Sequence, residues 1–241
     1  MIKVVLFDLD GTLLGLDNDR FGKPYISLLS KAVFEEIGYD ARATYKLVFG
    51  PIGMMVKNPN TKLNNVEQFY ALLKDIIYPH DINKTIEKIE AFYSSPMYDS
   101  LENTVDRRKE MIEAVKILKQ KGYKVAVCTN PIFPKLAITK RLKWAGFDVS
   151  DFEFVTFGEE THSLKPNLSY YQEAIKQHFN DISYDEIMMV GNDVEEDMVV
   201  EKLGMKTYLV KDYMISRFNR ENEIENSGTG NDFLEYVKQK I

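Results

Sequence analysis

The sequence is poor in the features that mark several common classes of protein. Cys128 is its single cysteine among 241 residues, so no disulfide can form within the chain, and we expect a reducing compartment, the cytoplasm. Apolar runs are too short for a signal peptide or a membrane span. The 31 basic residues are outnumbered by 37 acidic ones, a balance that favours neither a nucleic-acid nor a membrane partner.

Histidine is scarce as well, which bears on the kind of metal the chain could bind. The three histidines, His80, His162 and His178, are scattered along the sequence, whereas a zinc site needs histidines and cysteines in a cluster. Hydrophobic residues are not scarce, since they make up 44% of the chain, an ordinary share for a protein with a sizeable core. We therefore expect a soluble globular protein without a zinc centre.

Short apolar runs predict the strands of a sheet that is covered on both faces. These runs span residues 2–7, 123–129, 152–157, 186–191 and 206–210. Amphipathic patterns typical of helices lie between or after them, at residues 105–122, 134–146, 166–179, 195–204 and 231–240. The alternation predicts an α/β fold with a mainly parallel sheet and right-handed crossovers.

Residues 16–104 break this alternation. They contain no convincing buried strand, but they carry helical stripes at 25–38, 65–79 and 82–95. We expect them to form an inserted helical domain, with a catalytic core made of residues 1–15 and 105–241. Gly15 and the segment near 100–104 are the expected hinges.

Polar residues that can do chemistry follow the expected strands. They are Asp8, Asp10, Gly11 and Thr12 after the first, Thr129 and Asn130 after the second, Lys165 in the loop after the third, and Asn192, Asp193 and Asp197 after the fourth. Ligands of an open parallel sheet bind beyond the carboxyl ends of its strands. We therefore expect these side chains to converge on one crevice.

The acids in this set indicate a cation. Asp8 and Asp10 are two residues apart, and like charges that close cost energy unless something offsets them. Three carboxylates with further oxygen donors, and a phosphate as an additional ligand, suit Mg²⁺ in octahedral geometry. Mg²⁺ is therefore the expected cofactor.

Four short motifs carry a resemblance to a known family. "DLDGT" at 8–12, "CTN" at 128–130, "LKP" at 164–166 and "VGNDVEED" at 190–197 resemble, in order and spacing, the motifs of the haloacid dehalogenase (HAD) superfamily. The match covers about residues 1–15 and 105–210. It implies a Rossmann-like three-layer core, and the position of the helical insert implies a cap of the family's first type.

The resemblance also implies an aspartyl-phosphate mechanism. Asp8 would be the nucleophile and a metal ligand. Asp10 would be the general acid and base, with its backbone carbonyl also on the metal. Thr129 and Lys165 would hold the phosphoryl oxygens, and Lys165 would neutralise the charge that grows on them. With an ordinary pKa, about 4, Asp8 would be ionised at neutral pH, and Asp10 would give the leaving alcohol its proton.

Three further residues receive roles from the same resemblance. Asn130 would help to bind the substrate by amide hydrogen bonds. The fourth motif departs from the usual Gly-Asp because Asn192 takes the place of the acid. Asp193 is then the preferred direct Mg²⁺ ligand, and Asn192 and Asp197 are expected to support the metal or to serve as alternative ligands.

These features predict a Mg²⁺-dependent phosphatase that acts on a small soluble phosphomonoester, a phosphorylated metabolite. A sugar-phosphate mutase similar to β-phosphoglucomutase is the main alternative, because it would share every core residue. A dehalogenase is less favoured, since that branch lacks an acid two residues after the nucleophile. A phosphonate hydrolase would need a cap lysine, and nothing marks Lys57 or Lys62. A non-catalytic binding module is disfavoured because Asp8 and Asp10 are both present.

Overall fold

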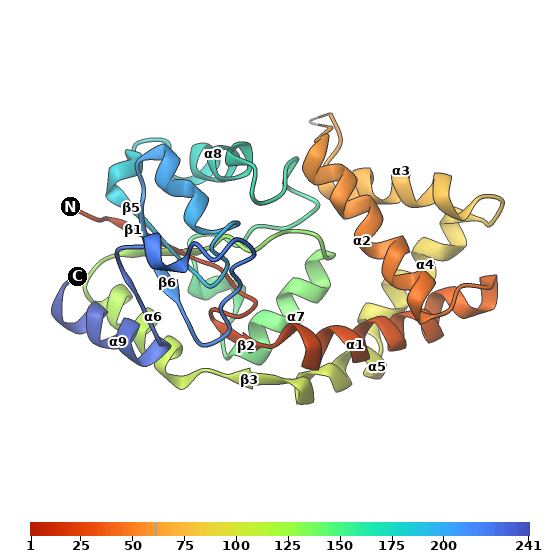
Figure 1. Ribbon diagram of the computed structural model, residues 1–241, viewed down its shortest axis with the longest axis horizontal. Helices are drawn as coiled ribbons and strands as arrows, with labels where there is room; N and C mark the ends of the chain where they lie inside the picture. The colour runs from red at the N-terminus through yellow and green to blue at the C-terminus, as the bar shows by residue number, and fades with distance from the viewer. Residues whose placement is uncertain (61) are drawn as a thin grey trace.

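The computed structural model describes residues 1–60 and 62–241. Figure 1 shows two groups of elements side by side: a sheet with its covering helices, which holds both chain ends, and a separate group of helices from the red-to-yellow part of the chain. Within the described residues no helix is both long and apolar enough to cross a membrane. The site lies where the two groups face each other.

The main sheet is parallel throughout, as predicted. Its strands lie in the order β4 (Lys124–Val127), β1 (Val4–Phe7), β5 (Ile187–Gly191), β6 (Lys206–Val210) and β7 (Ser227–Gly228). Phe7 at the end of β1 lies level with Val127 on β4 and Val190 on β5. The segments that leave these three strands therefore start at the same height, which brings distant parts of the sequence together.

The strand expected at 152–157 is only partly formed. Val155 makes a single parallel bridge to Val127 on the outer side of β4, supported by a backbone hydrogen bond of 2.8 Å from Glu153 N to Val125 O. The segment emerges from a 3-10 turn, η4 (Val149–Asp151), and soon reaches Gly158, whose carbonyl accepts from Val66 N. The chain thus runs beside β4 too briefly for a regular strand. The two-residue strand β7 was not predicted.

Helices cover both faces of the sheet and confirm the three-layer Rossmann-like fold. Val5 and Phe7 belong to the core cluster of α6 (Lys109–Gln120) and α9 (Gly230–Gln239), whereas Val4 and Leu6 pack on the side of α8 (Leu168–His178). Alternate side chains of a strand point to opposite faces, so β1 is buried on both sides. The α-helix expected at 195–204 is instead a shorter 3-10 helix, η6 (Met198–Leu203), and just before it Asp193 N donates to Asp197 Oδ2.

The chain passes between the two groups twice, and the two crossings pair with each other. β2 (Leu14–Leu16) lies antiparallel to β3 (Val105–Arg107), with Gly15 opposite Asp106. A Cβ on Gly15 would lie 2.9 Å from the Asp106 carbonyl oxygen, so this close pairing requires glycine. The helix expected at 105–122 therefore begins later, at Lys109, because its first residues form β3. The 3-10 helix η3 (Ser100–Thr104) leads into this crossing.

The helical group contains more helix than the sequence predicted. It comprises α1 (Asn18–Leu29), α2 (Ala41–Lys57), α3 (Asn65–Ile77), α4 (Ile82–Ser94) and α5 (Pro96–Asp99). α3 and α4 confirm two of the expected stripes. The first stripe is divided: α1 starts at Asn18, where Asp17 accepts from two backbone N–H groups, and a π-helix, η1 (Ser30–Phe34), and a 3-10 turn, η2 (Glu35–Ile37), follow it. α2 was missed because Pro51 lies within it, a residue that normally breaks a helix.

The core layer depends strongly on Phe233 of α9. This ring is fully buried and packs edge-on against Phe7, with ring centroids 5.9 Å apart. We expect Phe233→Ala to lower the free energy of unfolding by about 3–5 kcal/mol, because it leaves a cavity beside β1. Phe218→Ala is the matched control, since that ring is 71% exposed, and its effect should stay within about 0.5 kcal/mol. Equal losses in urea denaturation would contradict this view of the core.

Candidate active site

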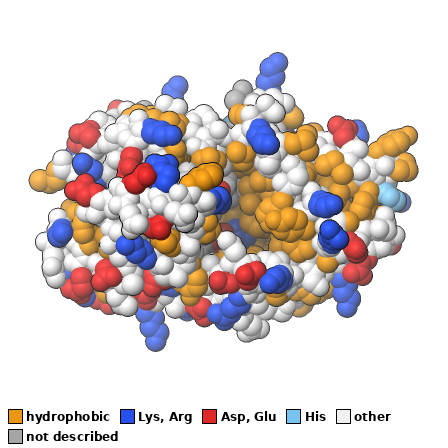
Figure 2. All heavy atoms as spheres, in the orientation of Figure 1, with side chains coloured by type: hydrophobic (Ala, Val, Ile, Leu, Met, Phe, Trp, Pro, Cys, Tyr) orange, Lys and Arg blue, Asp and Glu red, His pale blue; other side chains and the backbone are white. Residues whose placement is uncertain are grey.

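A cavity of about 1150 Å³ lies between the carboxyl ends of the strands and helices α1 and α2. Figure 2 shows the surface hollowed between the two groups, with hydrophobic side chains gathered on the side of the helical group. The core side of this cavity contains most of the residues expected from the sequence. They are Asp8, Asp10, Thr129, Asn130, Asn192, Asp193 and Asp197. The register of β1, β4 and β5 explains why these separate motifs meet.

Lys165 lies behind this wall and joins two of the acids. Its Nζ donates to Asp8 Oδ1 at 2.8 Å and to Asp197 Oδ1 at 2.6 Å, and the lysine is only 1% exposed. Burial opposes its positive charge, but Asp197 and Asp8 hold the pKa of Lys165 well above its usual value. Gly191 makes room for Asp197, since a Cβ there would lie 2.2 Å from Asp197 Oδ2. Lys165 is therefore a fixed positive charge beside Asp8.

Asp8 differs from the ordinary aspartate that the sequence suggested. Burial is the main cause that raises its pKa, to about 8; Lys165 lowers it, and Asp197 and Asp10 raise it further. An acid whose pKa is raised in the folded state costs stability once the pH exceeds its unfolded value. Ionised Asp8 therefore lowers the stability of the folded protein, and a bound cation would reduce this loss.

Asp10 has a different environment, built around an arginine that the sequence did not indicate. Arg141 on α7 (Lys135–Ala145) is fully buried, and its Nε donates to Asp10 Oδ1 at 3.0 Å. Its Nη1 donates to the Tyr98 hydroxyl at 3.1 Å, and its guanidinium lies over the Phe133 ring. The Asp10 side chain itself keeps 25% exposure. Asp10 is thus aimed by a rigid partner while it faces the cavity.

Asp193 has an arginine partner from the C-terminal part of the chain. Arg217 Nη1 donates to Asp193 Oδ1 at 2.8 Å, and the same oxygen accepts from the backbone N–H groups of Glu195 and Glu196. Burial raises the pKa of Asp193, although Arg217 lowers it. Burial also raises the pKa of Glu196 to about 7. Arg217 and Glu196 line the cavity and were not predicted as site residues.

Thr129 and Asn130 follow β4 with different degrees of freedom. The Thr129 hydroxyl lines the cavity and has no hydrogen-bond partner among the described residues, while its carbonyl is fixed by the Tyr170 hydroxyl at 2.6 Å. Asn130 Nδ2 donates to Glu196 Oε2 at 3.0 Å. Their neighbour Cys128 is buried, and burial raises the pKa of its thiol to about 12. Cys128 is therefore a packed residue and not a reactive thiolate.

Asn192 braces the turn after the two aspartates. Its Oδ1 accepts from the Thr12 hydroxyl at 3.2 Å, and its Nδ2 donates to the Tyr213 carbonyl at 2.6 Å. Gly11, with φ +94°, lies so close that a Cβ would be 2.1 Å from Asn192 Nδ2. Arg108 donates to the Thr12 carbonyl from the other side. The backbone that follows Asp10 is therefore held on two sides.

The oxygen atoms of this wall fit a hard divalent cation. Asp8 and Asp193 each use only Oδ1 in hydrogen bonds within residues 1–60 and 62–241, which leaves one carboxylate oxygen of each available. No three acidic, histidine or cysteine side chains of the described chain form a preassembled metal cluster; Asp10 Oδ1 accepts from Arg141 and Asp193 Oδ1 from Arg217. The remaining oxygens are ligands of the type that Mg²⁺ prefers.

Comparison with known proteins identifies the family. A model of the haloacid dehalogenase-like hydrolase family matches residues 2–199. The chain belongs to this family, which confirms the resemblance carried by the four motifs, and it is a hydrolase by class.

The individual relatives share 25% identity or less with this chain. Pyrophosphatase PpaX of Halalkalibacterium halodurans is 25% identical over 213 residues, which cover 87% of this chain and 83% of the relative. A predicted phosphoglycolate phosphatase from Haemophilus somnus has a similar structure, with a TM-score of 0.64, 16% identity and 98% of each chain covered. The HAD-hydrolase YfnB from Bacillus subtilis, bound to magnesium, gives 0.58, 18% identity, and coverage of 100% of this chain and 99% of its own. These structures share the fold.

Gly11 offers a test of how tightly this turn is built. Gly11→Ala introduces a side chain at positive φ and pushes it into Asn192, whereas Gly122→Ala adds one at φ +88° with no atom within 4 Å. The control should lose about 1–2 kcal/mol of stability from the backbone conformation alone. Gly11→Ala should lose clearly more in the same urea titration. Equal losses would mean that the Gly11–Asn192 approach is not tight.

Proposed function

We propose that this chain is a magnesium-dependent phosphatase that hydrolyses a small phosphomonoester through an aspartyl-phosphate on Asp8, with Asp10 as general acid and base. The observation that carries the proposal is the pair of environments at one cavity. Asp8 is paired with the buried Lys165, and Asp10 with Arg141. Lys165 places a positive charge beside the carboxylate of Asp8, and Arg141 orients Asp10 toward the same cavity, so Asp8 can act as nucleophile and Asp10 as proton carrier.

In the first half-reaction an Asp8 carboxylate oxygen attacks phosphorus, and the bond from phosphorus to the ester oxygen breaks. Asp10 gives its proton to the departing alkoxide, so the alcohol leaves neutral. Lys165 and the Thr129 hydroxyl stabilise the charge that develops on the phosphoryl oxygens. Arg141 keeps Asp10 aimed at the leaving oxygen throughout.

In the second half-reaction a water molecule attacks phosphorus, and the bond to Asp8 breaks. Asp10, now ionised, takes the proton from that water, so phosphate leaves and both acids return to their starting states. Bound Mg²⁺ would supply positive charge that screens Asp8 and the phosphoryl oxygens. Asp8, the Asp10 main-chain carbonyl and Asp193 are the residues that would hold it, with Asp197 and Asn192 supporting them.

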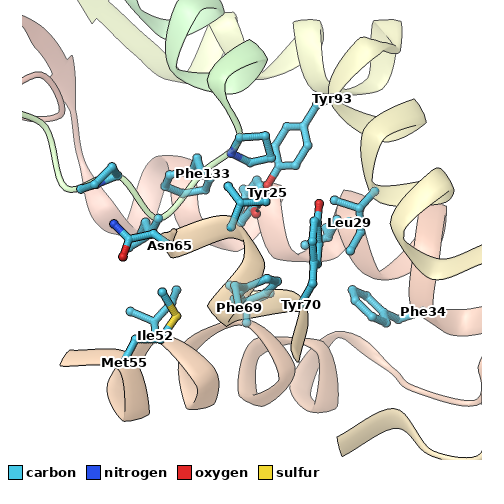
Figure 3. A pocket seen from close by; sticks show the side chains of 16 residues that line it. Tyr25, Leu29, Phe34, Ile52, Met55, Asn65, Phe69, Tyr70, Tyr93 and Phe133 are labelled. Carbon is cyan, nitrogen blue, oxygen red and sulfur yellow. Dashed lines mark hydrogen bonds between the residues drawn. The ribbon is translucent and has the colours of Figure 1, made fainter. Parts of the chain in front are cut away.

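We propose that two parts of the chain have different roles. Residues 1–15 and 105–241 would form the catalytic core, and residues 16–104 would form a cap that excludes water and selects a small phosphorylated metabolite. A second cavity lies between the cap helices and core residues 131–134, and Tyr25, Tyr70 and Phe133 are among the residues that line it (Figure 3). Its volume is only about 40 Å³, so it is a packing gap and not a place for substrate.

Replacement of the two aspartates tests their roles. Asp8→Asn should abolish phosphate release from small phosphomonoesters, because no carboxylate is left to attack phosphorus. Asp10→Asn should slow the reaction roughly 10²–10⁴-fold, as expected when a general acid is lost. Circular dichroism should show that both variants fold. Near-normal rates in either variant would contradict its assigned role, and a hexose 1-phosphate isomerised faster than phosphate appears would favour a mutase.

The metal requirement can be measured apart from turnover. Mg²⁺ titrated into the protein in a calorimeter should bind, and Asp193→Asn should weaken that binding at least roughly tenfold, because the carboxylate is replaced by a neutral amide. Asp181→Asn is the matched control, since Asp181 is exposed and lies outside the cavity. A chelator should also stop phosphate release. Unchanged Mg²⁺ affinity in Asp193→Asn would remove Asp193 from the ligand set.

A further inference from the structure

Helix α2 presents an unusual stripe to the active-site cavity. Arg42, Tyr45, Lys46 and Phe49 are spaced i, i+3, i+4 and i+7, so they lie along one side of the helix, and all four line the cavity. Tyr45 is 54% and Phe49 38% exposed, although large aromatic rings are usually buried. Their ring centroids are 4.5 Å apart and their planes are inclined by 37°, so the two rings pack against each other and present one aromatic surface as a pair.

This stripe is not needed to hold the helix in place. A separate set of α2 side chains packs inside the helical group: Thr44, Leu47, Val48, Pro51 and Met55 are all buried. α2 therefore already has an apolar side that anchors it. The exposed rings form a second apolar surface, which faces the cavity.

The charges beside these rings favour an anion. Arg42 and Lys46 are exposed and form no ion pair within the described residues, whereas Lys23, the third basic residue of the cap wall, is paired with Asp19 at 3.1 Å. The opposite, core wall is rich in carboxylates. A ligand that fits both walls has a phosphate that binds at the proposed Mg²⁺ site on the core wall. It also has a flat apolar part that contacts the aromatic surface on α2.

We propose that the substrate is a phosphomonoester whose alcohol carries a planar conjugated ring, and that Tyr45 and Phe49 stack on this ring. The inference rests on the proposed function and names its substrate class. Aromatic side chains can stack on many kinds of planar ring, and a cation close to the rings strengthens the stacking interaction. The cavity, about 1150 Å³, has room for a ring in addition to the phosphate, since small-molecule sites usually measure about 300–1000 Å³.

A matched pair of esters isolates the ring. Uridine 5′-monophosphate and ribose 5-phosphate carry the same sugar and phosphate, and only the first has a base. We expect kcat/KM for the nucleotide to exceed that for ribose 5-phosphate by about tenfold or more, mainly through KM, given the usual strength of base stacking. Pyridoxal 5′-phosphate, assayed in parallel, separates a nucleobase from another conjugated ring as the source of the preference.

The variant Tyr45→Leu/Phe49→Leu should reduce this preference to about twofold or less, because the stacking surface is removed. Tyr78→Leu is the control: Tyr78 is an 82% exposed cap tyrosine outside the cavity, and its loss should leave the preference intact. A wild-type enzyme that does not prefer either ring ester, or a preference that survives the double variant, would overturn the inference.

Nucleotide binding to the catalytically inactive Asp8→Asn variant tests this inference separately from the proposed function. Uridine 5′-monophosphate should bind Asp8→Asn protein with Mg²⁺, and the added Tyr45→Leu/Phe49→Leu changes should weaken binding about tenfold. If no ester is hydrolysed but this difference persists, the phosphatase proposal fails and the ring site stands. If esters are hydrolysed but the nucleotide binds both proteins equally, the ring site fails alone.

Discussion

The structure depends on the burial of several carboxylates at one end of a sheet, with few positive charges to offset them. Asp8 and Asp197 share the ammonium of Lys165, and all three side chains are buried. Ionised groups removed from water cost several kcal/mol each unless their geometry is excellent. The parallel strands fix this geometry, and Gly191, where a Cβ would strike Asp197, allows the acid to approach. A rigid core is therefore a condition for the site.

The same constraint explains why two neighbouring aspartates have different environments. Asp8 is deeply buried, and burial raises its pKa, so its charge depends on Lys165 and on a cation. Asp10 keeps contact with the cavity and is oriented by Arg141, which Tyr98 holds in turn. Tyr98 lies in α5, close to the crossing between the core and the helical group. The orientation of Asp10 therefore depends on the packing of the segment that leads into the helical group.

Local patterns predicted much of the fold and of the site. Apolar runs located four strands well, because buried parallel strands have little choice of composition, and the register of Phe7 with Val127 and Val190 then assembles the motifs. Arg141 was missed because its partner Asp10 lies 131 positions away, and no local pattern reports such a contact. α2 was missed because Pro51 resembles a helix stop, whereas tertiary packing of its neighbours overrides that preference.

The central claim is that Asp8 carries the phosphoryl group during turnover. It is tested most directly by rapid acid quenching of Asp10→Asn protein mixed with Mg²⁺ and a hydrolysable phosphomonoester, followed by mass spectrometry of the peptide that contains Asp8. With an aryl phosphate, whose leaving group departs without a proton, Asp10→Asn should still form the intermediate and should accumulate it, because water attack needs the base. We predict a phosphoryl adduct on Asp8 that disappears when Asp8 is also changed to asparagine. Continued phosphate release without any adduct on Asp8 would contradict the account.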